Sequence, residues 1–467
     1  MAAAKKLGVI DALFLAAETR ESMMHVGGLL VFTPPPDAPS GGFLRALADG
    51  LRDQPEVQPP WNLELRRPEM LKNPLNTWVE DKDFDLDYHV RRSALPSPGD
   101  ERELGILVSR LHGIQMDFHR PLWEVHFIEG LAGGRFAMYF KVHHALLDGY
   151  TGMRMLAASL SADPDERGTS LFFARPPRTR LGGTGGAGAP TLSALFEALR
   201  GQAGAMRDVG RAIANVVRAS RAKDRSLVAP LSAPRSILNR RISRNRRFAT
   251  QQFDFERVKR VARTAGGTVN DVILALSGAA IRRLLLDLGE LPQKPLIAML
   301  PVNVRPKDDP GGGNAVAAIL ASLATDIADP TARLQAIIQS TTRAKEQLQG
   351  MSRGAILQYS ALLMAPLSIQ LSTGTAGRTK PAFNVVISNV PGPENPLYFN
   401  GARLDALYAA SIPFHGYGLN ITITSYAGTL NFGFTGCRDT LPHLQRLAVY
   451  SGEALEELER QPALASA

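Results

Sequence analysis

Short apolar runs alternate with amphipathic segments along the first 160 residues. Residues 25–32 form an apolar run that ends before three prolines, a pattern typical of a strand. Residues 123–129 and 135–144 predict two further strands, and Gly133-Gly134 between them predicts a hairpin turn. Helical segments are expected at 39–52 and 151–160. The pattern therefore predicts an α/β domain.

The same alternation returns after residue 249. Residues 253–265 and 269–288 have helical periodicity, and the apolar run 296–304 is typical of a buried strand. Further strands are expected at 382–390, 419–424 and 430–435, and a last helix at 441–459. A second α/β domain follows from this half of the chain.

The region between the two halves has a different composition. Residues 174–190 are rich in Pro and Gly, which predicts a linker, and 191–222 are helix-forming. An arginine cluster without acidic residues follows: Arg235, Arg240, Arg241, Arg244, Arg246 and Arg247. It fits a solvated linker and a contact with an anionic surface or phosphate equally well. We expect three parts: 1–160, a basic linker at 161–248, and 249–467.

The charge balance points to an anionic partner. The 467 residues include 53 Lys+Arg and 44 Asp+Glu, a formal net charge of +9. A membrane surface, a nucleic acid or a phosphorylated substrate would each suit this charge. The arginine cluster lacks interleaved aromatic residues and no recognition motif accompanies it, which argues against nucleic acid. The single cysteine, Cys437, excludes an intramolecular disulfide and a four-cysteine zinc site.

Two segments bear on membrane association. The N-terminal apolar run is interrupted by Asp11 and lacks a cleavage site, so no signal peptide is expected. Residues 354–377 are uncharged and long enough to span a bilayer, but Gln358, Pro366 and Gln370 make them too polar for a typical span. A buried helix is favoured over one that dips into a membrane.

Two adjacent histidines end the strand predicted at 135–144. Side chains alternate along a strand, so His144 continues the apolar face of Phe136 and Val142, whereas His143 lies on the other face. His144 is therefore expected to enter an apolar space that holds substrate. Imidazole titrates near neutrality, which suits a general base.

Two residues after the histidines are further candidates for the site. Asp148 would either fix the imidazole tautomer or anchor the loop, and Gly149 would leave a channel open. Adjacent histidines on a strand cannot bind one metal ion from the same face, and no HExxH spacing occurs, so no metal is expected. No G-x-S-x-G is present, which excludes the nucleophile elbow of the α/β hydrolases.

The motif His143-His144-x-x-x-Asp148-Gly149 resembles the HHxxxDG superfamily of CoA-dependent acyltransferases and peptide-synthetase condensation domains. Further segments resemble the bacterial wax ester synthase/diacylglycerol acyltransferase family in particular. They are residues 7–15 and 24–28, Pro121-Leu122-Trp123, Asn270-Asp271, 303–306 and 388–393. They occur in the family's order and cover nearly the whole chain.

The resemblance implies a fold and a reaction. It implies two α/β domains of the chloramphenicol-acetyltransferase or condensation type, with a substrate tunnel between them. Acyl-CoA would donate to a long-chain alcohol or diacylglycerol, with His144 deprotonating the acceptor hydroxyl; acyl-CoA is a substrate, and no cofactor is expected. The alternative is a stand-alone condensation-type amide or ester synthase that takes its donor from a carrier protein.

The resemblance also suggests roles for single residues. Asp148 would pair with Arg305 to hold the loop, and Asn270 would stabilise the oxyanion or cap a helix. The candidate substrate-binding residues are Pro121, Leu122, Trp123, Asp271, Arg305, Ser388 and Asn389, although packing suits the first three better.

The expected location is the bacterial cytoplasm, with peripheral attachment to the inner membrane or to lipid inclusions. Two residue-level observations agree with a lipid substrate: the apolar face that ends at His144, and the uncharged segment 355–371, which suits the lining of an acyl or alcohol channel. The basic surplus suits both CoA phosphates and an anionic lipid surface.

Overall fold

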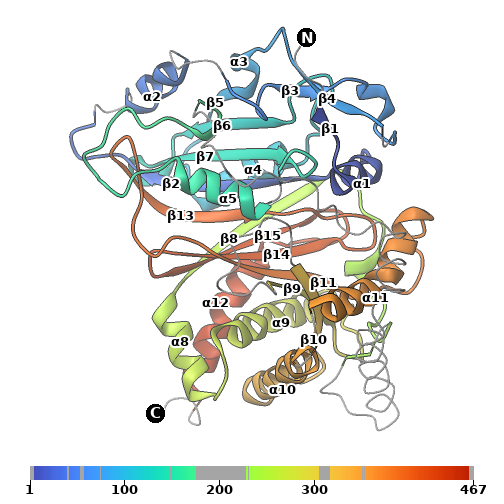
Figure 1. Cartoon of the computed structure of the whole chain (residues 1–467). Helices are drawn as coiled ribbons and strands as arrows, with labels where there is room; N and C mark the ends of the chain where they lie inside the picture. The colour runs from blue at the N-terminus through green and yellow to red at the C-terminus, as the bar shows by residue number, and fades with distance from the viewer. Residues whose placement is uncertain are drawn as a thin grey trace.

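The computed structural model describes residues 5–38, 42–52, 57–73, 75–147, 149–174, 228–229, 231–303, 316–349, 351 and 353–461. Two large β-sheets lie one above the other, and helices cover the lower sheet from below (Figure 1). Each sheet has six strands in the described part of the chain. The α/β architecture expected from both halves of the sequence is confirmed.

The upper sheet has the strand order β12-β13-β2-β7-β6-β5. Its strands are β2 (His25–Thr33), β5 (Val90–Ala94), β6 (Trp123–Glu129), β7 (Phe136–His143), β12 (Tyr398–Phe399) and β13 (Ala402–Ala410). The helices of this half are α1 (Val9–Ala17), α2 (Phe43–Arg52), α3 (Leu86–His89), α4 (Glu101–His112) and α5 (Gly149–Ala158). A small sheet beside it consists of β1 (Lys5–Lys6), β3 (Leu63–Leu65) and β4 (Thr77–Glu80).

The lower sheet has the strand order β10-β9-β11-β14-β15-β8. Its strands are β8 (Arg246–Asp254), β9 (Ile297–Asn303), β10 (Val316–Ser322), β11 (Val385–Pro391), β14 (Leu419–Tyr426) and β15 (Thr429–Cys437). Its helices are α8 (Phe255–Thr264), α9 (Val269–Asp287), α10 (Pro330–Leu348), α11 (Arg353–Ser372) and α12 (Arg446–Glu459). The expected β14–β15 hairpin is present, with antiparallel pairing from Leu419–Gly436 to Tyr426–Thr429.

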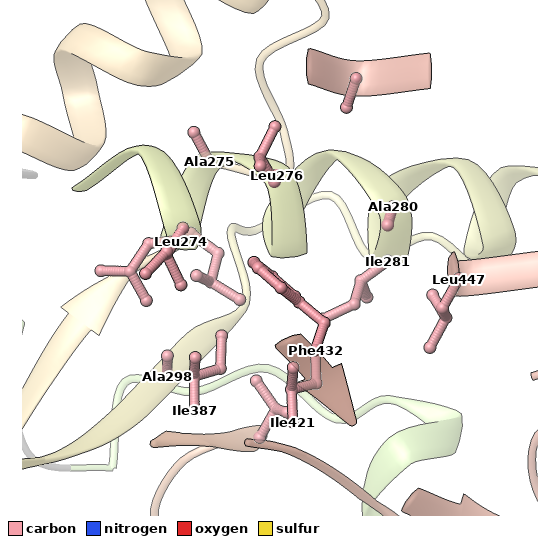
Figure 2. Close-up of a cluster of buried hydrophobic side chains, with 14 of the residues drawn as sticks. Leu274, Ala275, Leu276, Ala280, Ile281, Ala298, Ile387, Ile421, Phe432 and Leu447 are labelled. Carbon is pink, nitrogen blue, oxygen red and sulfur yellow. The ribbon is translucent and has the colours of Figure 1, made fainter. Parts of the chain in front are cut away.

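The core of the lower half lies between α9 and the sheet. Leu274 and Ile281 of α9 face Ile387, Ile421 and Phe432 on the strands, and α12 closes the side (Figure 2). These side chains are almost fully buried. Burial of this apolar surface holds α9 on the sheet, and with it the first turn of the helix, where Asn270 and Asp271 lie.

The two sheets do not correspond to two consecutive halves of the sequence. β13 pairs antiparallel with β2 in the upper sheet, although its residues come from the last fifth of the sequence (Figure 1). β8 begins at Arg246, within the expected linker, and the short helix η4 (Ile237–Asn239) is also buried there. Part of the arginine cluster therefore belongs to the folded body, while residues 175–227 of the expected linker lie outside the described residues.

Helix α11 is the expected uncharged helix. Gly354–Ser372 is long and apolar enough to cross a membrane by length and composition, and 35% of that window is buried. Leu362, Ile369 and Leu371 are 44%, 61% and 40% exposed. The helix is therefore only partly a core helix, and an apolar side of it faces outward.

Candidate active site

The two histidines lie at the end of β7. Met138, Phe140 and Val142 pack into the core of the upper half, whereas Tyr139 belongs to a second cluster on the other face. The strand ends at His143, so the alternation stops one residue before His144. The apolar face of β7, expected to border a substrate space, is instead filled by the protein's own core.

His144 is held by its backbone and packed on an aromatic ring. Its N–H donates to the Met24 carbonyl over 2.8 Å. Its imidazole stacks on Phe14 of α1, with ring centroids 3.9 Å apart and an angle of 20° between the planes. The residue as a whole is partly exposed, and the backbone hydrogen bond and the ring stack hold it in place.

His143 is locked inside the protein. Its side chain is 1% exposed, and Nδ1 accepts the Ala145 N–H over 3.1 Å. The ring proton of the neutral imidazole is therefore on Nε2, which lies 3.4 Å from Oε2 of Glu18. The His143 N–H donates to the Leu122 carbonyl, which ties the end of β7 to the start of β6.

Glu18 is a site residue that sequence reasoning missed. Its Oε2 accepts the Met24 N–H over 2.5 Å, and its Oε1 accepts Nε2 of Gln115 over 2.8 Å. Phe14 and Glu18 are four residues apart at the end of α1, so one side of the helix touches both histidines. The sequence carries no local signal for this contact, because Glu18 lies outside the segments 7–15 and 24–28 and far along the chain from His143.

A buried ion pair lies on the same face of β7 as His143. Lys141 Nζ is 3.3 Å from Glu124 Oε2, and it also donates to the carbonyls of Leu111 and Ile114. Burial raises the pKa of Glu124, but the hydrogen bond from His126 and the charge of Lys141 outweigh burial and lower that pKa to about 2. Burial lowers the pKa of Lys141, and Glu124 partly offsets this effect.

His112 extends this polar layer toward β13. Its Nε2 donates to the Ser411 carbonyl over 2.9 Å, and its Nδ1 accepts the Tyr139 hydroxyl over 2.7 Å. Burial lowers the pKa of His112 to about 3, so the ring is neutral at physiological pH. His25 donates to the His112 carbonyl and has its pKa lowered by burial in the same way.

Pro121, Leu122 and Trp123 are buried, and the last two are fully so. Trp123 Nε1 donates to the Trp61 carbonyl over 2.7 Å, and the Trp123 carbonyl accepts from His89. These contacts agree with the packing role that the sequence favoured. The segment positions β6, and through the Leu122 carbonyl it positions His143.

The Asn270-Asp271 pair does not act as expected at the start of α9. Thr268, not Asn270, caps the helix, and Asp271 completes a capping box by accepting the Thr268 N–H. The other Asp271 oxygen accepts the Thr341 hydroxyl over 2.6 Å, and the residue is 2% exposed. The cap interpretation of Asn270 is therefore wrong, and Asn270 is left partly exposed at the second helical position. Asp271 has a structural role here, and its substrate-binding role stays a prediction.

The other site residues expected from the sequence lie on different elements or outside the described residues. Ser388 and Asn389 lie on β11, within the strand expected at 382–390, and their substrate-binding role stays a prediction. Gly149 is the first residue of α5. Asp148 and Arg305 lie outside the described residues, and so does their expected pairing. Among the described residues, no group of three or more His, Cys, Asp or Glu is placed to hold a metal ion.

Comparison with known proteins places this site in a family. The two stacked α/β halves define the two-domain fold class that the chain shares with the solved structure of an acyltransferase. The chain matches the wax ester synthase/diacylglycerol acyltransferase catalytic domain over residues 7–273 and the C-terminal domain of the same family over residues 312–459. It belongs to the wax ester synthase/diacylglycerol acyltransferase family and is an acyltransferase.

Individual relatives cover almost the whole chain. A Mycobacterium tuberculosis protein named provisionally as a diacylglycerol O-acyltransferase is 53% identical over 97% of both chains. The O-acyltransferase WSD of Acinetobacter baylyi is 40% identical over 97% of both chains. The wax ester synthase/diacylglycerol acyltransferase structure from Marinobacter aquaeolei has 40% identity and a TM-score of 0.79, covering 97% of this chain and 98% of that one.

A more distant likeness concerns the fold alone. The first condensation domain of the CDA synthetase has 17% identity and a TM-score of 0.58, with 98% of this chain covered and 97% of that one. The expected condensation-type fold is confirmed.

Proposed function

We propose that this protein transfers a long-chain acyl group from acyl-CoA to the hydroxyl of a fatty alcohol or of diacylglycerol, with His144 as the general base. The products would be wax esters or triacylglycerols. The observation that carries the assignment of the base is the difference between the histidines: His143 is enclosed and faces Glu18, whereas His144 is partly exposed. We therefore assign the base to the partly exposed ring of His144 and not to the enclosed ring of His143.

The reaction needs one proton carrier. His144 removes the proton from the acceptor hydroxyl, and the oxygen attacks the thioester carbonyl carbon. The C–S bond then breaks, and the CoA thiolate takes the proton back from the imidazolium. The stack on Phe14 and the backbone bond to Met24 would keep the imidazole in place through both steps. Acyl-CoA is a substrate in this scheme, and no cofactor or metal takes part.

We propose further that the protein works in the bacterial cytoplasm at the surface of the inner membrane or of lipid inclusions. Both acceptors are lipids, and the net charge of +9 suits an anionic surface. The outward apolar side of α11 supports the same location. Nucleic acid has no part in this proposal.

The test is release of free thiol from palmitoyl-CoA with hexadecanol, with diacylglycerol and without acceptor. We expect acceptor-dependent release by the wild type and its loss in His144→Ala, whereas His119→Ala, the same change at an exposed histidine, keeps activity. Unchanged turnover in a folded His144→Ala variant would refute the general base. Efficient turnover with a carrier-protein donor but none with acyl-CoA would favour the condensation-type alternative.

A further inference from the structure

A groove of about 730 Å³ lies where the C-terminal end of α4 meets the start of β8. Six arginines line it: Arg20, Arg110, Arg244, Arg246, Arg247 and Arg438. Neither Asp nor Glu is among its lining residues. The groove therefore concentrates positive charge from distant parts of the chain into one concave surface.

Most of these guanidinium groups have no protein partner. Among the described residues, Arg20, Arg110 and Arg244 are exposed and take part in no ion pair or hydrogen bond through their side chains. Arg247 is half-buried, and its Nε is enclosed without a hydrogen-bond acceptor. A buried donor left without an acceptor is unfavourable, so the groove suits a ligand that supplies acceptors.

The other two arginines form the fixed part of the groove. Arg246 is buried and donates to the carbonyls of Ser243 and Glu21, which joins β8 to the segment before β2. Arg438 lies 3.6 Å from Asp439, both side chains being about half exposed. The Asp439 carboxylate also accepts from Ser243 and Asn245, so its charge is shared.

The groove adjoins the histidine site. Met23 lines it and precedes Met24, whose carbonyl accepts the His144 N–H. Gln115 also lines it and donates to Glu18, which faces His143. A ligand in the groove would therefore lie against the same short segments that hold the two histidines.

We propose that this groove binds the phosphate groups of the acyl-CoA donor. CoA carries a 3′-phosphate and a 5′-diphosphate, and planar guanidinium groups bind phosphate through paired, charge-assisted hydrogen bonds. Ile106 and Ile114, 40% and 52% exposed, offer apolar surface to the adenine ring at the same groove. The inference rests on the proposed function, because it assigns the donor of that reaction to a place.

The test replaces two arginines whose side chains make no hydrogen bond or ion pair with the described residues. The double variant Arg20→Gln/Arg244→Gln removes two charges without breaking a described contact. Arg260→Gln/Arg263→Gln, on exposed positions of α8, makes the same change of charge away from the groove and is the matched control. Calorimetry with CoA and with pantetheine, which lacks the phosphates, measures binding without any acceptor.

We expect the Kd for CoA and the KM for palmitoyl-CoA to rise at least about tenfold in the groove variant. The kcat and the constants for palmitoyl-pantetheine should stay at wild-type values, and the control should stay within about twofold of the wild type. Equal losses with the pantetheine donor, equal losses in the control, or unchanged CoA binding would each overturn the proposal.

A lipid headgroup is the competing phosphate source. Binding to phosphatidylglycerol vesicles that is lost in the groove variant, with CoA affinity unchanged, would assign the groove to the membrane and refute the CoA site. Because calorimetry needs no turnover, the two proposals can fail separately. If CoA binding depends on the groove but no acyl group is transferred to either lipid acceptor, the CoA-binding proposal is supported and the proposed reaction is refuted.

Discussion

Oε2 of Glu18 lies 3.4 Å from Nε2 of His143, and both side chains are almost completely buried. The same oxygen accepts the Met24 N–H, while the Met24 carbonyl accepts the N–H of His144. One carboxylate at the end of α1 is therefore connected to both histidines, directly to one and through a single residue to the other. Glu18 is a positioning residue for the proposed base.

Changing Glu18 should reduce turnover more than stability. Glu18→Gln keeps an oxygen that can accept the Met24 N–H but removes the negative charge beside His143. We expect kcat to fall about tenfold with little change in KM or in the urea midpoint, because the charge that orients His143 is lost while the acceptor of the Met24 N–H remains. Glu18→Ala also leaves the Met24 N–H without an acceptor and should cost about 1–3 kcal/mol of stability.

The control for these variants is Glu129→Gln, which neutralises a partly exposed carboxylate, paired with Arg92 at the surface, at the far end of β6. It should match the wild type in both measurements. If Glu18→Gln kept full kcat, or if both Glu18 variants lost activity only in proportion to unfolding, the positioning role would be refuted.

Replacing His143 should have a different signature from replacing His144. His143→Ala removes the acceptor of the Ala145 N–H and leaves the Glu18 charge enclosed, so we expect a stability loss of about 1–3 kcal/mol. Turnover should fall less than in His144→Ala, because the ring that would take the proton remains. Thiol release and urea unfolding of both variants check this, and equal loss of kcat in two folded variants would contradict the division of roles.

The strands near the site could be predicted because their signals are local. The apolar runs at 123–129 and 135–144 gave β6 as observed and β7 to within a residue. The face of β7 could not be interpreted equally well. An apolar face looks the same in sequence whether it borders a substrate or the protein's own core, and in β7 it borders the core.

Contacts between distant segments were not predictable from one sequence. β13 joins the upper sheet, and Glu18 reaches His143 across 125 positions, through tertiary packing that leaves no local pattern. The cap of α9 is a different case. Thr268 with Asp271 three residues later is a recognised N-terminal signature, so the helix start expected at 269 was right and only its cap was assigned to the wrong residue.

The corrected cap of α9 separates a structural pair, Thr268 and Asp271, from a candidate chemical group, the Asn270 amide. Thr268→Ala should lower the free energy of unfolding by about 1 kcal/mol, because α9 loses its cap, and leave kcat near the wild-type value. Asn270→Ala should have the opposite effect if the Asn270 amide helps to stabilise the oxyanion: the free energy of unfolding stays unchanged and kcat falls by up to about tenfold. Urea unfolding and thiol release on both variants check the separation; a destabilised Asn270→Ala variant with normal kcat would reverse the assignment.

The buried histidines should make the protein sensitive to mild acid. Burial lowers the pKa of His112 to about 3 and that of His89 to about 4, whereas both titrate near 6.5 in an unfolded chain. As pH falls below 6.5 the unfolded state takes up protons that the folded state cannot, so stability is present above pH 6.5 and is lost toward pH 4. Each histidine should contribute a slope of about 1.4 kcal/mol per pH unit between its folded-state and unfolded-state pKa values.

Urea unfolding at pH 7.5, 6 and 5 measures how steeply the free energy of unfolding falls with pH. His89→Gln should make it shallower, whereas His119→Gln, at an exposed position, should not. Equal stability at pH 7.5 and pH 5 would show that these rings are protonated in the folded protein, contrary to the hydrogen bonds that His112 donates and accepts.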